Sequence, residues 1–526
     1  MQTGKFIKNA AALTVTALIL RSIGMVFRIW LSAAVGEEGM GLYQLIISVY
    51  VLASTFATSG ICTAVTRLIA EELECGGEKS VRRILRRSVL LSLIVAAVST
   101  AAVFLLADGI AVYWIKDARA ALSLRILSLS LPFMGVSSCI RGYFIARRRV
   151  AVQSTAQIFE QLVRISLIML IIGRFAPLGI GYACAAVLIG DTVAEACACV
   201  YMYIGYLRDK KRAADGAAVG RSSPPYSVVG RIVSISLPIT AGRYLTTALR
   251  TAENLLVPQK LAAAGGSYDG ALAAFGRLKG MALPILFFPG SFLSALSTLM
   301  VPEMSAAAAS GDREGIRSAA KKTICITSEL SMLIAGVFLV FSREIGVAVY
   351  RSEEVGVLLR CLAPLVPLMY LESVTDGILK GLDQQNSLFW YNVVDSAVRI
   401  GLIYAIVPMS GMSGFLTVMV VSNVLTSTLC IGRLLRTAGM GVDAVGWFVR
   451  PAVCAAVSCA SAGGVMHFIA APDVVILVLG ALIAAAVYLL TMRASGGFAE
   501  FSFVKSAAAK KRARSETRLR QAADRR

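Results

Sequence analysis

Long apolar runs separated by short polar connections fill most of the chain, from about residue 10 to residue 493. Each run has roughly 20 residues, enough for a helix to cross about 30 Å of hydrocarbon. The pattern therefore predicts an all-α membrane protein with about fourteen transmembrane helices. Their approximate limits are 10–33, 42–68, 88–107, 121–145, 153–173, 179–206, 230–257, 271–301, 322–342, 356–379, 387–408, 412–434, 446–469 and 473–492.

The composition supports a membrane location and excludes several chemistries. Of the 526 residues 57% are hydrophobic and only 16% are charged, whereas soluble chains are about a quarter charged. The single histidine, His467, leaves little material for histidine metal sites or histidine-dependent nucleophiles. The sequence has neither a G-x-x-x-x-G-K-[ST] nor a G-x-G-x-x-G nucleotide motif. We therefore expect no enzyme activity, no metal and no cofactor.

Basic residues gather in every second connection between the predicted spans. The second, fourth, sixth and eighth connections hold Lys79, Arg82, Arg83, Arg86 and Arg87; Arg147, Arg148 and Arg149; Arg208, Lys210, Lys211, Arg212, Arg221 and Arg231; and Arg313, Arg317, Lys321 and Lys322. The odd-numbered connections are acidic or mixed, as in Gly36-Glu37-Glu38-Gly39. The positive-inside rule then places the even connections and both termini in the cytoplasm.

The net charge of +21 is concentrated in these connections and in the tail after Arg493. That tail has nine Lys or Arg against three Asp or Glu, a composition typical of a segment close to anionic lipid. We expect anionic membrane lipids as partners of the tail and no nucleic acid.

An internal repeat relates the two halves at an offset of 235 residues. Val81-Arg82 corresponds to Ile316-Arg317, Pro132 to Pro367, Gly142 to Gly377, and Glu160 with Arg164 to Asp395 with Arg399. Each half holds six spans, so the copies have the same orientation, as in parallel-repeat transporters. The predicted domains are a six-helix lobe at 1–206, a cytoplasmic linker at 207–229, a second six-helix lobe at 230–436, two additional spans within 437–493, and a basic cytoplasmic tail at 494–526.

Some charged residues within the spans have a counter-charge on the same helix face. Glu160 and Arg164, and likewise Asp395 and Arg399, are four residues apart, a spacing that lets the members of each pair neutralise each other. We interpret both pairs as structural. Asp191 and Glu195 are a like-charge pair that needs a proton, a cation or a basic neighbour. Together with Glu253 they are the candidates for an ion or proton site.

Other charges within the spans are arginines without an obvious local partner. Arg21 and Arg28 lie seven residues apart on the first span, and Arg243 and Arg250 have the same spacing on the seventh. Arg277 adds a guanidinium on the eighth span, and Glu253 is placed to compensate Arg250 in part. Because charge in hydrocarbon is costly, these groups indicate a wet cationic cavity suited to phosphate oxygens. The alternative is that the side chains reach the headgroups at the cytoplasmic surface.

Several segments match a known group of membrane proteins. They are Arg21-Ser-Ile-Gly24 with Arg28, Val35-Gly-Glu-Glu-Gly-Met-Gly-Leu-Tyr43, Thr66-Arg-Leu-Ile-Ala-Glu71, Arg141-Gly-Tyr-Phe144, Glu160-Gln-Leu-Val-Arg-Ile165 and Gly377-Ile-Leu-Lys-Gly-Leu-Asp383. Over spans one to twelve the chain resembles the stage V sporulation protein B-like branch of the oligosaccharide flippase family. This branch belongs to the MOP superfamily, with the lipid II flippase MurJ and the multidrug MATE exporters.

The resemblance implies a flippase of the bacterial cytoplasmic membrane that moves a polyprenyl-diphosphate-linked saccharide by alternating access. It implies substrate contacts from cavity arginines on spans one, two and eight, which here are Arg21, Arg28, Arg67 and Arg277. It also implies that the lipid tail follows the two additional spans. Cell-wall synthesis enzymes would then be natural partners.

Two other functions remain open from the sequence. A cation-coupled multidrug exporter would need acidic cavity walls, whereas the predicted cavity is basic. A non-transporting scaffold would recruit cell-wall enzymes through the basic connections and tail. Loss of saccharide translocation on replacing Arg21 and Arg243 would separate a flippase from both alternatives.

Overall fold

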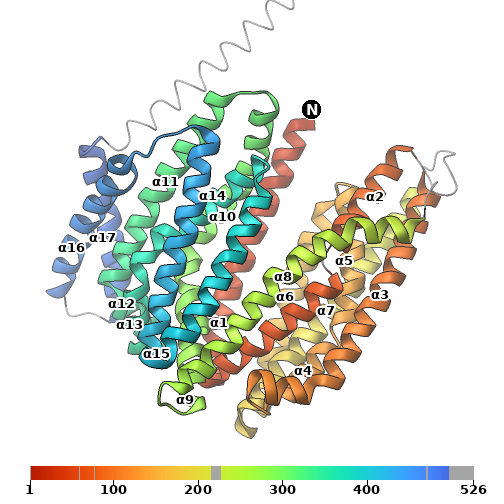
Figure 1. The fold of residues 1–526 in the computed structure, drawn as a ribbon, viewed down its shortest axis with the longest axis horizontal. Helices are drawn as coiled ribbons and strands as arrows, with labels where there is room; N and C mark the ends of the chain where they lie inside the picture. The colour runs from red at the N-terminus through yellow and green to blue at the C-terminus, as the bar shows by residue number, and fades with distance from the viewer. Residues whose placement is uncertain (1, 59, 76, 215–226, 470–471, 497–526) are drawn as a thin grey trace, which may run out of the picture. The chain divides into compact units, whose positions relative to one another are not determined.

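The computed structural model describes residues 2–58, 60–75, 77–214, 227–469 and 472–496. Most of the predicted linker and nearly all of the basic tail thus lie outside the described residues. Every regular element in the described ranges is a helix (Figure 1). The elements up to residue 282 are α1 (Gln2–Thr58), α2 (Ile61–Cys75), α3 (Glu78–Gly109), η1 (Ile110–Ile115), α4 (Ala120–Ser128), α5 (Leu131–Ala146), α6 (Val150–Phe175), η2 (Ala176–Leu178), α7 (Ile180–Ala214), α8 (Val228–Ala263), α9 (Tyr268–Phe275) and η3 (Gly276–Ala282).

The remaining elements are also helical, and several of them are short. They are α10 (Leu283–Ala309), α11 (Arg313–Val340), α12 (Ser342–Tyr350), α13 (Glu353–Leu362), η4 (Ala363–Leu365), α14 (Val366–Gly381), α15 (Gln385–Ala438), η5 (Val445–Val449), α16 (Arg450–His467) and α17 (Asp473–Ala494).

Eleven helical segments of the described chain are long and apolar enough to cross a membrane. Two of them each contain two predicted spans. The first breaks at Gly36, whose φ of 78° leaves the helical region, and the other breaks at Gly411 with φ 58°. Because glycine adopts positive φ without a Cβ clash, it permits these breaks. The eleven candidates therefore cover thirteen of the fourteen predicted spans.

Helix α8 corresponds to the predicted seventh span but is not among the eleven candidates. It has 36 residues, which is ample length, and includes two prolines. Arg231, Arg243, Arg250 and Glu253 lie along it and lower its mean hydropathy. The expectation of fourteen apolar spans was thus wrong for α8, because this helix is long enough to span a membrane but is not apolar enough.

The contacts divide the chain into two compact units, which differ from the predicted lobes. One unit comprises Met1–Ser291 with Phe389–Ser422, and the other Phe292–Leu388 with Asn423–Arg526. Helices α8 and α9 and the first part of α15 thus belong with the N-terminal helices. This division does not test the internal repeat, and the predicted lobes stay a prediction.

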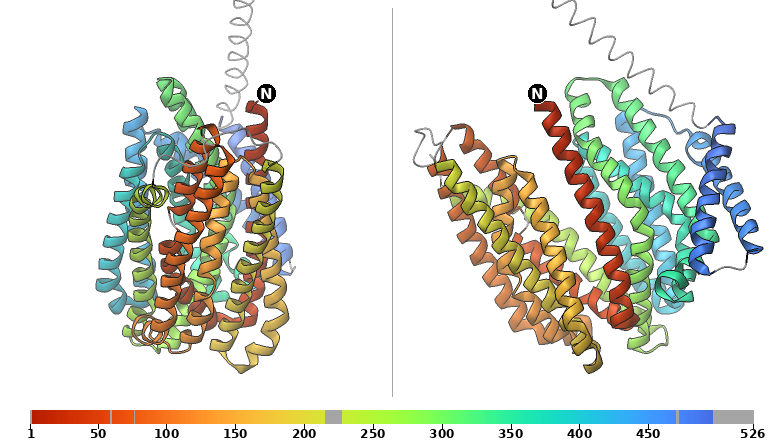
Figure 2. Two further views of the ribbon diagram at one scale, coloured as in Figure 1. Left: turned by 90° about the vertical axis from the view of Figure 1, so that its right-hand side faces the viewer. Right: turned by 180° about the vertical axis from the view of Figure 1, so that it is seen from behind.

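The first unit has a core where α2, α3, α5 and α7 meet. Its fully buried side chains include Leu68, Ile84, Tyr143 and Phe144. Helices α6 and α7 pack side by side in the same unit (Figure 2). The second part of α1 approaches α9 and η3 so closely that a Cβ on Gly41 would lie 2.1 Å from a backbone oxygen of Leu272.

The second unit packs α11 against α14, α16 and α17. The neighbouring helices α16 and α17 are the two additional predicted spans (Figure 1). The hydroxyl of Tyr488 on α17 donates to the backbone oxygen of Glu329 on α11 at 2.8 Å. This contact and the buried Met492 fix α17 to the rest of the unit.

Candidate functional site

A polar cavity of about 340 Å³ in the first unit is lined by residues from both parts of α1, on either side of the break. Its charged and polar lining comes from both parts of α1, from α6 and from α7. The lining residues are Gly24, Phe27, Arg28, Leu31, Tyr43, Ile47, Tyr50, Val51, Leu127, Gln161, Arg164, Asp191 and Glu195. Several candidate site residues that are distant in the sequence thus share one cavity.

Arg164 is the main cation of this cavity. Its Nη2 lies 2.5 Å from Oε1 of Glu160, and its Nη1 donates to Oε1 of Gln161 at 3.0 Å. Its Nε lies 2.7 Å from Oδ1 of Asp191, an ion-pair contact that is not aligned as a hydrogen bond. Asp191 therefore has the basic neighbour that its like-charge pairing required.

Glu195 and Arg28 also line the cavity. Within the described chain, no oppositely charged side chain lies within salt-bridge distance of either group. Both side chains are partly buried. Arg164 forms its ion pairs with Glu160 and Asp191, so Glu195 and Arg28 are the two charged lining residues outside any salt bridge of the described chain.

A second ion cluster joins α8, η3 and the first part of α15. Arg399 Nη1 donates to Oε1 of Glu253 at 3.0 Å, and its Nη2 lies 3.3 Å from Oδ2 of Asp395. Lys279 Nζ is 3.7 Å from the same Glu253 oxygen. Ser422 accepts from Arg399 at 3.0 Å and donates to Asp395 at 2.5 Å. Two cations thus face two carboxylates.

Glu253 has more partners than its position three residues from Arg250 indicated. It was placed to compensate Arg250, three residues away on the same helix. Arg250 does act on Glu253 electrostatically, but the ion pairs of Glu253 are formed with Arg399 and Lys279 from other elements. Its side chain is only 4% exposed, so it points into the packed interior, where both partners lie.

Two of the six arginines expected to contact substrate are held by carboxylates. Arg277 has no partner nearby in the sequence but pairs with Glu37, which is 240 residues away. The break at Gly36 and the close packing of α1 on η3 bring these residues together. Arg67 Nε lies 3.0 Å from Glu71 Oε1, and Arg231 reaches the other oxygen of Glu71 at 2.8 Å.

The other four arginines have no carboxylate within salt-bridge distance in the part of the chain that the structure describes. Arg21, Arg243 and Arg250 are exposed, and Arg28 is partly buried. Of these four, Arg28 lines the polar cavity. The first part of α1 and α8 thus each present guanidinium groups that are available to an external anion.

Sequence reasoning missed an ion network centred on Arg119, between η1 and α4. The guanidinium contacts Asp117 at 2.7 Å, Glu38 at 2.7 Å and Asp269 at 3.0 Å. Hydrogen bonding to Asp117 raises the pKa of Arg119 above its usual range, and Glu38 adds to this effect. The acidic connection Gly36-Glu37-Glu38-Gly39, which has no base of its own, was the available signal.

Comparison with known proteins identifies the relatives of this fold. Residues 6–307 match the family model described as polysaccharide biosynthesis protein. Stage V sporulation protein B of Bacillus subtilis (strain 168) is 26% identical over 439 residues, covering 81% of this chain and 82% of that protein. Lipid II flippase MurJ of the same organism is 27% identical over 203 residues, covering 36% of this chain and 37% of that protein.

The fold itself matches a solved structure of lipid II flippase MurJ in an inward closed conformation. The TM-score is 0.68 at 12% identity, and the match covers 92% of this chain and 99% of that one. At this identity the match shows the fold. The family model, by contrast, matches more than half of the chain by sequence. This multi-pass membrane protein therefore belongs to the polysaccharide biosynthesis protein family, which is a family of transporters and not of enzymes.

Proposed function

We propose that this protein is a flippase that moves a polyprenyl-diphosphate-linked saccharide across the bacterial cytoplasmic membrane. The observation that carries the proposal is that Arg21, Arg28, Arg243 and Arg250 have no carboxylate within salt-bridge distance in the described chain. Its family and its similarity to a lipid II flippase support the same class of cargo.

The physical argument rests on the cost of an unpaired guanidinium in a membrane protein. An arginine at the centre of a spanning helix costs about 2.5–3.5 kcal/mol on insertion scales, so it faces water, headgroups or a counter-ion. A guanidinium donates two parallel hydrogen bonds to phosphate oxygens. A diphosphate therefore matches pairs of arginines, such as those on α1 and on α8, better than a neutral or cationic cargo does.

In this proposal α8 crosses the membrane as the seventh span and brings the total to fourteen, and its polar residues line the transport route. The two six-helix lobes then alternate between opening to the cytoplasm and opening to the outside, with both termini in the cytoplasm. Arg67 and Arg277 are engaged with Glu71 and Glu37 in the present conformation. They could contact the substrate only after those ion pairs exchange partners during the cycle.

The carboxylates separate into two roles within the same proposal. Glu160, Asp191, Asp395 and Glu253 are neutralised by Arg164, Arg399 and Lys279 and hold the helices together. Glu195 lines the polar cavity and has no cation within salt-bridge distance in the described chain. We assign it to binding a proton or a cation that is coupled to transport.

The experiment is a flipping assay in vesicles that contain the purified protein. The cargoes are lipid II and a polyprenyl-diphosphate-linked polysaccharide repeat unit, and the test variant combines Arg21→Ala with Arg243→Ala. The matched control is Arg343→Ala, because Arg343 is an exposed arginine outside the candidate spans. We expect flipping to be lost in the double variant and retained in the control.

The same assay separates the alternatives. Unchanged flipping in the double variant contradicts an arginine grip on the diphosphate. Failure of the wild-type protein to flip either cargo, together with uptake of an organic cation, favours a multidrug exporter. Absence of all transport, with retention of cell-wall enzymes on the membrane, favours a scaffold.

A further inference from the structure

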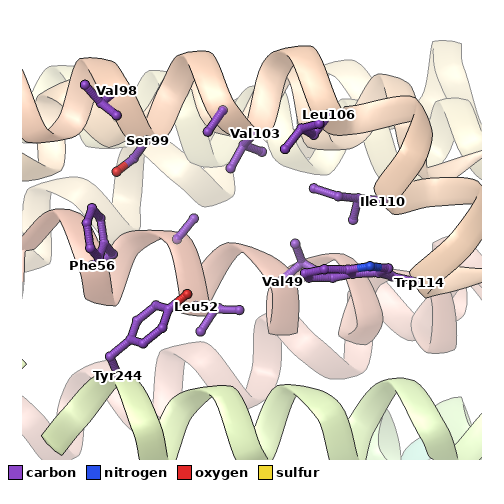
Figure 3. A pocket seen from close by; sticks show the side chains of 12 residues that line it. Val49, Leu52, Phe56, Val98, Ser99, Val103, Leu106, Ile110, Trp114 and Tyr244 are labelled. Atoms are coloured by element: carbon purple, nitrogen blue, oxygen red, sulfur yellow. The ribbon is translucent and has the colours of Figure 1, made fainter. Parts of the chain in front are cut away.

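A second cavity of the first unit has a very different lining. It has a volume of about 290 Å³ and lies between the second part of α1, α3, η1 and α8. Figure 3 shows the side chains around it, with Trp114 at the η1 end and Phe56 and Tyr244 at the opposite end. Its lining residues are Val49, Leu52, Ala53, Phe56, Val98, Ser99, Ala102, Val103, Leu106, Ile110, Trp114 and Tyr244.

The lining of this apolar groove gives water almost nothing to bind. The hydroxyl of the lining residue Ser99 donates to the backbone oxygen of Val95 at 2.9 Å. The remaining polar side-chain atoms belong to Trp114 and Tyr244, which lie at opposite ends in Figure 3. A buried water needs two to four polar partners, so we expect the groove to hold hydrocarbon.

The groove is elongated along the helices and opens towards lipid. From Val98 to Trp114 the chain advances roughly 24 Å at 1.5 Å per helical residue. Val98 and Leu106 are each 60% exposed, and the adjacent Leu105 is 77% exposed, all within a candidate span. An elongated apolar trough open to the bilayer suits a hydrocarbon chain better than a compact ligand.

A charged residue precedes one of the lining residues of this trough in the sequence. Arg243 precedes Tyr244 on α8, and its side chain is exposed with no carboxylate within salt-bridge distance in the described chain. An amphiphile with an anionic head and a long apolar tail has complementary chemistry to this combination. A lipid diphosphate is such an amphiphile, because its phosphate oxygens suit a guanidinium.

We propose that the apolar groove binds the polyprenyl chain of the transported lipid while Arg243 contacts its diphosphate. This assignment rests on the proposed flippase function and adds the place of the tail. It differs from the expectation that the tail follows the two additional spans, α16 and α17. The groove and Arg243 both belong to the first unit, whereas those two helices belong to the second.

The energetic reason for such a groove is packing rather than escape from water. Because lipid tails are themselves apolar, moving a polyprenyl chain from bilayer to groove gains little hydrophobic free energy. The gain comes from dispersion contacts with fixed walls. The groove therefore binds a lipid chain whose shape fits its walls. A side chain that fills the groove should abolish this binding.

The test fills the groove with one side chain. Ala102→Phe places a ring among the lining residues, and Ala101→Phe, the matched control, makes the same change one position earlier, outside the lining. Both alanines are exposed on α3, so neither change overpacks a buried core. We expect Ala102→Phe to slow flipping of a long-chain polyprenyl-diphosphate saccharide by about tenfold, equivalent to about 1.4 kcal/mol. Ala102→Phe should leave the flipping rate of an analogue with a single isoprene unit unchanged, because that analogue has no long chain to place in the groove.

A photolabelling experiment locates the tail independently of transport. A polyprenyl diphosphate with a diazirine at the end of its chain is added to vesicles containing the full-length protein. We expect it to label the 98–114 segment, and Ala102→Phe but not Ala101→Phe to prevent the labelling. A phosphatidylglycerol with a diazirine on its acyl chain tests ordinary lipid as the occupant. Equal labelling by that probe, or no competition from unlabelled polyprenyl diphosphate, would overturn the proposal.

The outcomes keep the groove and the flippase function distinguishable. Specific labelling of the 98–114 segment without flipping of any saccharide supports the groove and contradicts the function. Normal flipping without labelling of this segment, and with equal flipping rates in Ala101→Phe and Ala102→Phe, supports the flippase function and refutes binding of the tail in the groove.

Discussion

Two ion clusters of the first unit are built on the same sequence motif but have different charge balance. Glu160 with Arg164, and Asp395 with Arg399, are carboxylate–arginine pairs four residues apart. Around Arg164 the additional members, Asp191 and Glu195, are acidic. Around Arg399 one additional acid, Glu253, is accompanied by the base Lys279.

This difference indicates what each cluster does. The Arg399 cluster is balanced, and Glu253 is almost fully buried within it, so it fastens α8, η3 and α15 to one another. The Arg164 cluster has more carboxylates than cations and borders a cavity of about 340 Å³. A surplus carboxylate next to open space is where a proton or cation can be exchanged.

The largest predicted effect is that of Arg164→Ala. The substitution leaves Glu160 and Asp191 partly buried without their cation, and breaking such a pair typically costs about 3–5 kcal/mol. We expect a large loss of thermal stability in detergent, followed by size-exclusion chromatography after heating. Arg164→Lys should recover part of the loss, because a lysine keeps the charge but not the forked geometry. Wild-type stability of Arg164→Ala would show that the cluster is not structural.

Arg399→Ala should cost less than Arg164→Ala, because Lys279 still faces Glu253 and Ser422 still donates to Asp395. The loss of thermal stability is measured as for Arg164→Ala, by size-exclusion chromatography after heating in detergent. The double variant Arg399→Ala with Lys279→Ala should lose more than the sum of the single variants, since Glu253 is then left without a cation. Additive losses would mean that the two bases do not share Glu253.

Glu195→Gln should have the smallest effect on stability and a specific effect on transport. The amide keeps the shape of the side chain but cannot exchange a proton or bind a cation as a carboxylate does. We expect the stability of the variant to stay close to that of the wild type, while flipping loses its dependence on the pH or cation gradient. Asp395→Asn is the comparison, and we expect it to change stability and leave the gradient dependence intact. An unaltered gradient response in Glu195→Gln would remove this residue from the coupling site.

The sequence predicted those parts of the clusters that depend on a single helix. Spacing by four residues placed Glu160 beside Arg164 and Asp395 beside Arg399. It could not place Asp191 against Arg164 or Glu253 against Arg399, because those contacts join different helices. The family, the helical class and most spans were predictable from segment matches and apolar runs, which are local features.

The partners of the arginines, likewise, could not be predicted where they lie on different helices. Arg21 and Arg243, which have no nearby carboxylate in the sequence, also have none within salt-bridge distance in the described chain, whereas Arg277 has one. Its partner, Glu37, is 240 residues away and reaches it through the break at Gly36 and the tight packing of α1 on η3. The Arg119 network likewise joins Glu38, Asp117 and Asp269 from three separate segments.

The proposed binding of the diphosphate by arginine side chains is tested most directly by comparing the affinities for two cargoes. The measurement is the affinity of the purified protein for a saccharide on polyprenyl diphosphate and for the same saccharide on polyprenyl monophosphate. We expect the wild type to prefer the diphosphate by about tenfold or more, equivalent to about 1.4 kcal/mol. The Arg21→Ala, Arg243→Ala variant should bind both cargoes with similar, weaker affinity. Equal affinity of the wild type for the two cargoes would contradict the account.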